Sequence, residues 1–353
     1  MSVRVLIVDD SAVMRALIEK RLGKESDIEV VGSASDAKEA RHMMKALNPD
    51  VVTLDIEMPG MNGLTFLRKV MELRPTPVII VSGSTGPGAK ATIEAMQIGA
   101  VSCYAKSTRY RGMADDDHGR LASQVREAAT VKMLLPTTPA AMLAAAPKTG
   151  QQKPLVAQQA RPELIAIGSS TGGVEALHKL IPEFPVDCPP TVIVQHINAC
   201  FDEAIVDSLN RCTSANVALA RTDQVLEPGH IWLAPGGDKH LMVAEAGSRG
   251  CRTILRGGGA VSGHCPSVDK MFASVAQVYE AKALGILLTG MGQDGALGLL
   301  AMARAGAQTI AQDEDSSVVF GMPRAAIACG GAKTVLPLDD IANHVFRVRR
   351  AAA

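Results

Sequence analysis

The chain has 353 residues, more than one compact core ordinarily holds, so we expect two domains. Basic and acidic residues number 36 each, and the net charge of zero gives no overall basic field that would attract nucleic acid or an anionic membrane. Apolar residues make up 47% of the chain, enough for packed cores, and aromatic residues at 3% leave little for stacking on bases or sugars. Composition therefore excludes nucleic-acid coats, fibrous proteins and membrane proteins.

The cysteines and the apolar segments indicate the cellular location of the protein. The seven cysteines include no C-x-x-C pair, which favours reduced thiols over a disulfide framework or a zinc site. The first residues turn acidic after one short apolar run, unlike a secretory signal peptide. The longest apolar stretch, residues 140–146, is far too short to span a bilayer. We expect a cytoplasmic protein with no nucleic-acid partner and no membrane insertion.

A change in composition predicts the boundary between the two domains. Residues 133–162 contain five prolines and no acidic residue. Prolines at this density break helices and favour extended chain, so this segment is predicted to be a linker. We therefore predict one domain at residues 1–132 and a second at residues 163–353.

The first domain alternates short runs of valine and isoleucine with helical patterns. Strands are expected at residues 3–8, 28–33, 51–54, 77–81 and 100–104. Helices are expected at residues 12–22, 36–47, 63–71, 88–98 and 120–131. Because strands and helices alternate, we predict a doubly wound (βα)5 α/β domain, with a parallel sheet covered on both faces.

The second domain alternates in the same way. Strands are expected at residues 164–168, 191–195, 230–234, 284–288 and 308–312. Helices are expected at residues 173–181, 201–211, 268–279, 295–305 and 323–329. Short runs at residues 216–219 and 252–255 are expected to form an antiparallel edge. We predict a three-layer α/β/α domain with a mostly parallel sheet, whose functional residues lie beyond the carboxyl ends of its strands.

In the first domain, acidic side chains follow the carboxyl ends of two predicted strands. Asp9 and Asp10 end the first strand and Asp55 ends the third, so their carboxylates should converge and hold a cation such as Mg²⁺. Ser82 and Lys106 follow the fourth and fifth strands and add a hydroxyl and an ammonium. Any one aspartate could instead cap the following helix, but the joint placement of all five residues favours a functional pocket.

These residues lie in motifs that resemble a known family. The segments VDDSAVMR (8–15) and LDIEMPGMNGL (54–64) resemble the receiver domain of response regulators, over residues 1 to about 130. The resemblance implies that Asp55 accepts a phosphoryl group from a histidine kinase. It also implies that Asp9 and Asp10, together with Asp55, hold Mg²⁺.

The same resemblance implies how the phosphate is sensed. Ser82 and Lys106 would grip the phosphate and move the adjacent surface. Two positions depart from the family pattern: Ser107 replaces a proline that usually follows the lysine, and Cys103 replaces a usual aromatic residue. The departures leave phosphoacceptance at Asp55 as expected and put aromatic-rotamer switching in doubt.

The second domain carries a candidate for nucleophilic catalysis. Residues 168–172 read G-x-S-x-G between a predicted strand and a predicted helix, a turn that exposes a serine hydroxyl or, alternatively, cradles a phosphate. His196 and Asp294 also follow predicted strands, although each alone could be a helix-capping or packing residue. Together with Ser170 they make a Ser-His-Asp triad plausible. The chain order Ser, His, Asp disfavours the α/β-hydrolase topology, in which the aspartate precedes the histidine.

Further motifs identify the second domain by resemblance. It is similar to the effector domain of the chemotaxis protein-glutamate methylesterase (CheB) family over residues 163–348. The resemblance rests on IGSSTGG (167–173), QH (195–196), APGGDKHL (234–241), HCPSVDKMF (264–272), TGMGQDGA (289–296) and VVFGMPRAA (318–326).

This resemblance implies an activity and its residues. The enzyme would hydrolyse glutamyl methyl esters, and possibly deamidate glutamines, on chemoreceptor signalling helices, with no cofactor for the ester chemistry. Ser170 would be the nucleophile, His196 the base and Asp294 the orienting acid, while Thr171 and Met291 match positions near the oxyanion region. Its partners would be methylated chemoreceptors as substrate and a chemotaxis histidine kinase as phosphodonor. Phosphorylation would relieve obstruction of the Ser170 edge by the receiver.

Other interpretations of the chain fit less well. An output domain that only binds DNA would require a basic helix-turn-helix, and one that only binds protein would not require the three triad residues. A catalytically dead relative is disfavoured because all three positions are filled. The segment Gly83–Lys90 is not a P-loop, because the residue before Lys90 is not glycine and no serine or threonine directly follows Lys90. His240 and His264 could bind a metal, but no third ligand at suitable spacing accompanies them. Ser169, beside the predicted nucleophile, stands where most relatives have alanine.

Overall fold

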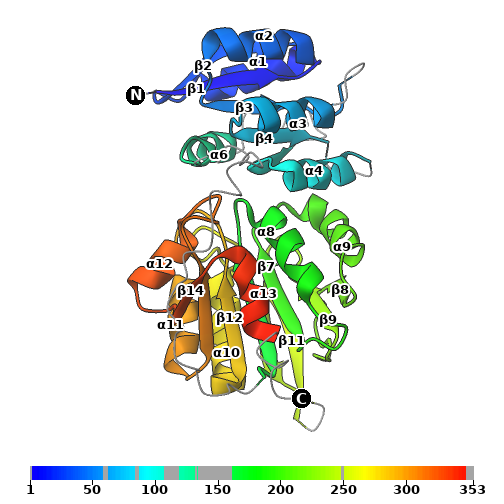
Figure 1. The fold of residues 1–353 in the computed structure, drawn as a ribbon, viewed down its shortest axis with the longest axis vertical. Helices are drawn as coiled ribbons and strands as arrows, with labels where there is room; N and C mark the ends of the chain where they lie inside the picture. Colours follow the sequence, from blue (N-terminus) through cyan, green and yellow to red (C-terminus); the bar gives the residue numbers. More distant parts are fainter. Residues whose placement is uncertain are drawn as a thin grey trace, which may run out of the picture.

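A computed structural model describes residues 2–58, 63–83, 87–106, 119–131, 133, 161–247 and 250–346. Most of the predicted linker, Ser107 and residues 347–353 lie outside the described residues. The described chain forms two parallel sheets, each covered by helices on both faces, and one two-stranded hairpin (Figure 1). The predicted α/β class is confirmed for both halves.

The N-terminal half is a five-stranded parallel sheet of order β2-β1-β3-β4-β5. Its strands are β1 (Val3–Val8), β2 (Ile28–Ala34), β3 (Val51–Leu54), β4 (Val78–Ser82) and β5 (Ser102–Ala105). Its helices are α1 (Ala12–Leu22), α2 (Ala37–Leu47), α3 (Gly63–Leu73), α4 (Pro87–Ile98) and α6 (Arg120–Ala129). Side chains of β3 and β4 are buried throughout, as expected for a sheet enclosed by helices.

The C-terminal half is a seven-stranded parallel sheet of order β14-β13-β12-β6-β7-β9-β8. Its strands are β6 (Leu164–Ser169), β7 (Thr191–Gln195), β8 (Asn216–Leu219), β9 (His230–Leu233), β12 (Ala283–Leu287), β13 (Gln308–Gln312) and β14 (Thr334–Leu336). Its α-helices are α8 (Gly173–Leu180), α9 (Asp202–Asn210), α10 (Val268–Tyr279), α11 (Ala296–Arg304), α12 (Met322–Ala328) and α13 (Leu338–Phe346), with short 3-10 turns between some elements. Strands β10 (Lys239–Glu245) and β11 (Cys251–Gly257) form a separate antiparallel hairpin.

The predicted antiparallel edge is wrong in part. Residues 216–219 form β8, which pairs parallel to β9 at the edge of the large sheet. Residues 252–255 do lie in an antiparallel strand, but their partner is β10. Strands β10 and β14 and helix α13 were not predicted from the sequence. A three-residue strand carries too little pattern to predict. Helix α13, in contrast, has aspartates in its first turn that signal a helix start.

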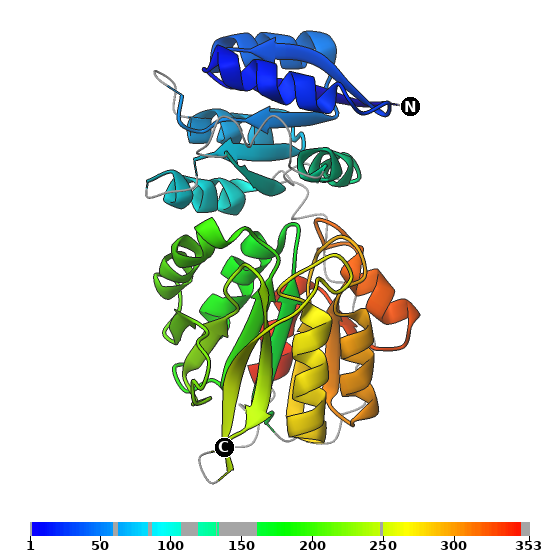
Figure 2. The same ribbon diagram turned by 180° about the vertical axis from the view of Figure 1, so that it is seen from behind.

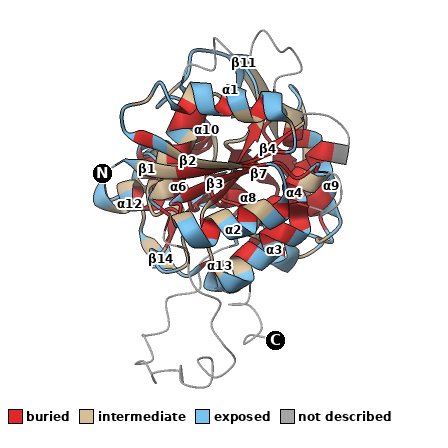
Figure 3. Ribbon diagram, turned by 90° about the horizontal axis from the view of Figure 1, so that it is seen from above, coloured by how far each residue is buried: buried red, intermediate tan, exposed pale blue. Residues whose placement is uncertain are grey.

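The two halves pack directly against each other, with α4 and α6 of the N-terminal half facing the C-terminal half (Figures 1 and 2). Helix α4 contacts α8 and α9, and Gln97 Nε2 donates a hydrogen bond to Ser208 Oγ at 2.8 Å. Val319, which follows β13, joins the apolar cluster around Leu121 and Val125 of α6. Buried residues concentrate on the strands and the inward faces of the helices (Figure 3). The junction is therefore partly apolar and partly hydrogen-bonded.

No helix in the described residues is both long enough and apolar enough to cross a membrane. Ser170 and His196, which directly follow β6 and β7, line one cavity together with residues of α6 in the N-terminal half. Side chains that follow these strands therefore lie at the junction between the halves.

Candidate functional site

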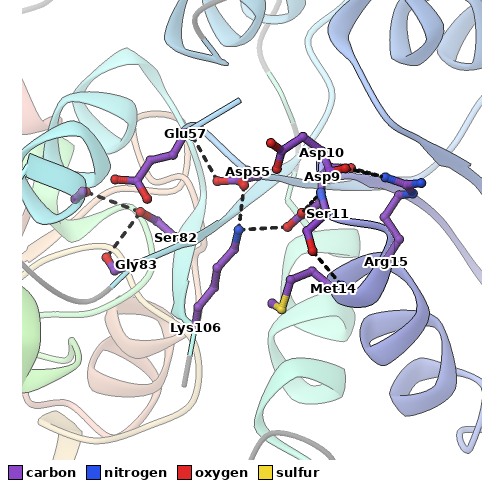
Figure 4. A network of polar contacts seen from close by, with 11 residues as sticks. Asp9, Asp10, Ser11, Met14, Arg15, Asp55, Glu57, Ser82, Gly83 and Lys106 are labelled. Atoms are coloured by element: carbon purple, nitrogen blue, oxygen red, sulfur yellow. Dashed lines mark hydrogen bonds and ion pairs between the residues drawn. The ribbon is translucent and has the colours of Figure 1, made fainter. Parts of the chain in front are cut away.

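Three carboxylates meet at the carboxyl edge of the N-terminal sheet. Asp9 and Asp10 follow β1, and Asp55 follows the neighbouring strand β3. One oxygen of each lies within 4.8 Å of the others, and Asp9 and Asp55 are buried whereas Asp10 is exposed. Lys106 Nζ lies 2.6 Å from Asp55 Oδ2 and 2.9 Å from Asp9 Oδ2 (Figure 4). The structure therefore brings together these three aspartates, which we call the acidic pocket, and the lysine predicted beside them.

The acidic pocket has the donor set of a divalent-cation site. Burial raises the pKa of Asp9, Lys106 opposes this rise, and the charge of Asp55 adds to it. Three carboxylates carry more negative charge than one lysine neutralises. Hard oxygen donors are the ligands that Mg²⁺ prefers, so the residues present fit this ion.

Ser82 lies at the same edge but does not bond to the acidic pocket. The backbone N–H of Lys106 donates to the Ser82 carbonyl at 2.8 Å, which places the two residues side by side. The buried Ser82 hydroxyl donates to the carbonyls of Gly83 and Gly88, each at 3.4 Å. Cys103 is buried in β5, and its carbonyl accepts a hydrogen bond from Gln124 Nε2 at 3.1 Å. The structure thus shows Cys103 as a packed core residue.

In the C-terminal half, Ser170 and His196 follow adjacent strands. Ser169 is level with Gln195 in the β6–β7 pairing, and the N–H of His196 donates to the Ser169 carbonyl at 3.0 Å. Ser170 is only 8% exposed, and together with His196 it lines one cavity of about 540 Å³. Among the described residues, the Ser170 hydroxyl forms no hydrogen bond to His196. The pair is thus placed in one cavity without the contact that proton transfer requires.

Asp294 is hydrogen-bonded to His196. Its Oδ2 accepts from His196 Nε2 at 2.9 Å, and the carboxylate is 1% exposed. The sequence alternative, a cap for the helix that begins near Gly295, is wrong. Asp294 instead accepts the N–H groups of Val268 at 2.8 Å and Asp269 at 3.0 Å, at the N-terminus of α10. A helix N-terminus has free N–H groups that stabilise a negative charge.

These contacts set the charge of Asp294 and the role of each His196 nitrogen. Burial alone would raise the pKa of Asp294, but hydrogen bonds from His196, the Asp269 backbone and Ser267 outweigh burial and hold this pKa below its ordinary value. Because an ionised carboxylate can only accept a hydrogen bond, the proton of a neutral His196 must be on Nε2, the nitrogen that bonds to Asp294. Nδ1 of His196 has no hydrogen-bond partner among the described residues, so its lone pair can accept a proton.

Three residues that support the pair were not predicted. Ser267 Oγ donates to Asp294 Oδ1 at 2.8 Å, and Gln195 Nε2 donates to the carbonyls of Ser170 and His196. The ring of His264 stacks on that of His196, with centroids 3.8 Å apart and planes at 6°. All three lie in motifs that carried the resemblance, QH (195–196) and HCPSVDKMF (264–272), but without a role assigned to them. Ser267 also has a local signal, because a serine before an apolar run is a helix-cap pattern.

Ser169 has a structural role that separates it from its neighbour Ser170. Its side chain is fully buried, and its hydroxyl donates to Gln195 Oε1 at 2.6 Å. A Cβ on Gly173 would lie 2.2 Å from the same Oε1, so the turn requires glycine there. Ser169 is therefore held in a packed polar cluster, whereas Ser170 faces the cavity.

The two residues predicted near an oxyanion site lie in different surroundings. Thr171 lines the cavity with Ser170, and its hydroxyl donates to Glu127 Oε2 of α6 at 3.3 Å. Met291 is 38% exposed and is not among the described residues that line this cavity. Its neighbour Gly290 approaches Ser170 so closely that a Cβ there would lie 2.7 Å from the serine Cβ.

Comparison with known proteins decides the family. The family model described as CheB methylesterase matches residues 165–345, more than half of the chain. This chain belongs to the CheB methylesterase family. The model for the response regulator receiver domain matches residues 5–114. This CheB-family chain is therefore a hydrolase that carries a receiver domain.

Relatives support the assignment across the full length. The chain is 46% identical over 349 residues to a "Protein-glutamate methylesterase/protein-glutamine glutaminase 1" from Caulobacter vibrioides, covering 99% of this chain and 98% of the relative. It is 47% identical to a similarly named protein from Agrobacterium fabrum, covering 99% and 97%. The crystal structure of the Thermotoga maritima CheB methylesterase catalytic domain matches 54% of this chain and 100% of its own, at 32% identity and a TM-score of 0.51.

Proposed function

We propose that the protein is a phosphorylation-activated methylesterase that hydrolyses γ-glutamyl methyl esters on chemoreceptor helices. The relatives that span 99% of the chain are named for glutamate methylesterase and glutamine glutaminase activity, which supports this substrate and amide hydrolysis on glutamine. We further propose that this activity serves sensory adaptation in chemotaxis and that the protein acts in the cytoplasm. The observation that carries the proposal is that His196, which shares one cavity with Ser170, is hydrogen-bonded to the buried Asp294.

The proposed chemistry is acyl transfer through Ser170. Nδ1 of His196 takes the hydroxyl proton, and Oγ attacks the ester carbonyl while the imidazolium is stabilised by Asp294. The proton passes to the departing methoxide, which leaves as methanol. His196 then takes a proton from water, the hydroxide attacks the acyl-enzyme, and the proton returns to Ser170 as the product carboxylate is released. Thr171 and Met291 are proposed to flank the oxyanion.

The proposed domains and their regulation follow from the receiver match. We assign residues 1–132 to the receiver, 133–162 to a linker and 163–353 to the esterase. Asp55 accepts the phosphoryl group from a chemotaxis histidine kinase, with Asp9 and Asp10 beside it as further metal ligands. When bound, Mg²⁺ neutralises charge on the transferring phosphoryl group.

Lys106 and Ser82 read the phosphorylated state in this proposal. Lys106 now pairs with Asp9 and Asp55. A phosphate on Asp55 would draw this ammonium and the Ser82 hydroxyl toward itself, because both are donors at the same edge. The resulting movement of β4 and β5 would reach α4, which contacts α8 and α9. Receptor access to Ser170 would rise as this junction loosens.

Ser170→Ala tests the assignment. We expect methanol release from methylated receptor membranes to fall by at least about a thousandfold, because the acyl acceptor is gone. Phosphorylation of Asp55 should be unchanged, which controls for folding. Ser169→Ala is the matched variant and should retain most of its activity. An active Ser170→Ala protein would contradict the assignment.

A further inference from the structure

A receiver carboxylate lies in the esterase cavity. Glu127, on α6, lines the same cavity as Ser170, Thr171 and His196. Its Oε2 accepts the hydrogen bond from Thr171 Oγ1 at 3.3 Å, and Thr171 directly follows Ser170 in the chain. Gln124, one helical turn earlier, lines the cavity too, and its buried Oε1 has no hydrogen-bond partner among the described residues. Helix α6 therefore presents polar glutamate and glutamine side chains to the reaction site.

The surroundings of Glu127 are those of a desolvated carboxyl with few donors. Burial raises the pKa of Glu127, and the hydrogen bonds from Thr171 and Ser123, together with the charge of His196, only partly offset that rise. The Ser123 hydroxyl donates to Oε1 at 3.4 Å. Within the described chain, no lysine or arginine forms an ion pair with Glu127. The contact is therefore weak enough to be displaced by a competing ligand.

The chemistry of Glu127 matches that of the proposed product. Hydrolysis of a methyl ester on a receptor helix leaves a glutamate side chain on that helix, with its carboxylate next to Ser170. Glu127 is also a glutamate on a helix, and its carboxylate is held by the residue after Ser170. The match rests on the proposed function, because only a glutamyl substrate makes Glu127 product-like.

We propose that the cavity beside Thr171 and His196 is the subsite for the γ-carboxylate of the product, and that Glu127 fills it as an internal product mimic. The receiver then competes with substrate in two ways, through the Glu127 carboxylate as a specific hydrogen-bond acceptor and through steric obstruction of the cavity. Competition of this kind raises the apparent KM of the unphosphorylated protein and leaves kcat unchanged. It also weakens inhibition by the free product to the same extent.

Other contacts between the halves make the role of Glu127 separable. The Gln97–Ser208 hydrogen bond and the packing of Val319 on α6 do not involve this carboxylate. Replacing Glu127 by alanine or leucine keeps good helix formers in α6. Leucine also keeps a side chain of similar length while removing the acceptor. Glu72→Gln changes an exposed glutamate on α3 and serves as a matched control.

The experiment measures methanol release by the unphosphorylated full-length protein from a synthetic helical peptide with one γ-methyl glutamate. The same peptide with free glutamate is the competing product. We expect Glu127→Ala and Glu127→Leu to lower KM and the product inhibition constant together, by about threefold to tenfold, the effect of losing one hydrogen bond. We expect kcat to stay within about twofold. Glu72→Gln should match the wild type, and a phosphodonor should reduce the differences between all four proteins.

Several results would overturn the proposal. If Glu127→Leu kept the wild-type KM while Glu127→Ala lowered it, bulk alone would block the site. If neither variant changed KM or product inhibition, the contact would have no effect on binding. A wild-type protein that releases no methanol even with a phosphodonor would instead contradict the proposed function, so the two failures are distinguishable.

Discussion

At the scale of single residues, the hydrogen bond between His196 and Asp294 determines which nitrogen is free to act as the proposed base. Nε2 points to Asp294 at 2.9 Å, so the free lone pair is on Nδ1. Most serine hydrolases described by the Ser-His-Asp template use the two nitrogens the other way round. Sequence spacing could not predict this, because it does not fix the rotation of a side-chain ring.

Asp294→Asn tests this arrangement. The amide can donate a proton to Nε2 and so favours the tautomer with the proton on Nδ1, where it cannot accept from Ser170. We expect kcat to fall by about a thousandfold or more, while KM changes little. Steady-state methanol release measures both constants. A variant with more than a tenth of wild-type kcat would contradict the role of Asp294.

The depressed pKa of Asp294 also predicts a pH dependence of stability. A carboxylate whose folded pKa is below its ordinary value of 3.8 stabilises the fold above that value, and this contribution is lost as pH falls through the lower pKa. The stability difference between wild type and Asp294→Asn should therefore be constant above about pH 5 and narrow as the pH falls below 3.8. Urea unfolding at several pH values measures it, and a difference that widens on acidification would contradict the shift.

His264 is expected to position the ring of His196. Burial lowers the pKa of His264 to about 4, and the charge of His196 acts in the same direction, so the stacked ring is neutral at pH 7. An aromatic pair of this kind contributes about twofold to tenfold in an equilibrium. His264→Ala should lower kcat by that factor, whereas His264→Phe should retain most of it because the flat ring remains. Equal losses in both variants would show that stacking is not what matters.

At the scale of elements, the start of α10 orients the proposed acid. Ser267 caps α10 through Lys270 N and also donates to Asp294, and the next two N–H groups hold the same carboxylate. A helix that packs beside β6 and β12 therefore fixes the acid at the ends of those strands. The motif HCPSVDKMF marked this segment by resemblance, but its contact with Asp294 joins residues too far apart in the chain for a local pattern to show.

Ser267→Ala should affect both stability and catalysis. Loss of the cap costs about 1 kcal/mol, and loss of the bond to Asp294 loosens the acid, so we expect kcat to fall by about tenfold. Ser274→Ala is the matched control, because Ser274 is a buried serine of α10 that bonds to Val243 N, away from Asp294. It should lower the unfolding free energy without lowering kcat. If both variants had wild-type kcat, the cap would have no catalytic role.

Alternation of strands and helices predicted most of both sheets, because buried parallel strands are apolar throughout. The errors lie at edges. Strand β8 pairs parallel to β9 although it was expected to be antiparallel, since its short pattern does not encode direction. The hairpin of β10 and β11 was only half predicted. The strand-end residues were predicted together because carboxyl ends of parallel strands share one edge, whereas the place of Glu127 depends on how two domains pack.

At the scale of the whole molecule, the acidic pocket and the esterase cavity belong to different halves that share one junction. Helix α4 contacts α8 and α9, and α6 reaches the cavity. A change at Asp55 therefore has a short physical route to Ser170 through β4, β5 and these helices. The proposed regulation requires that phosphorylation of Asp55 and ester hydrolysis at Ser170 depend on different groups.

Removal of Mg²⁺ tests whether phosphorylation and ester hydrolysis depend on different groups. Chelation should abolish phosphorylation of Asp55 by a small acyl phosphate, because the acidic pocket then lacks the cation that neutralises the phosphoryl group. Basal methanol release should be unchanged, since the proposed ester chemistry uses only Ser170, His196 and Asp294. Phosphoprotein labelling and methanol assays on one sample measure both. Loss of basal hydrolysis on chelation would contradict the separation.

The most direct test of phosphorylation-activated ester hydrolysis is methanol release from methylated receptor membranes, with and without a phosphodonor. The phosphodonor should raise the rate of methanol release by the full-length wild type by roughly 5- to 150-fold, the range typical of coupled sites. Asp55→Asn should show only the basal rate under both conditions, and Ser170→Ala should show none. Stimulation that persists in Asp55→Asn, or a wild-type rate that the phosphodonor leaves unchanged, would contradict control of Ser170 by phosphorylation at Asp55.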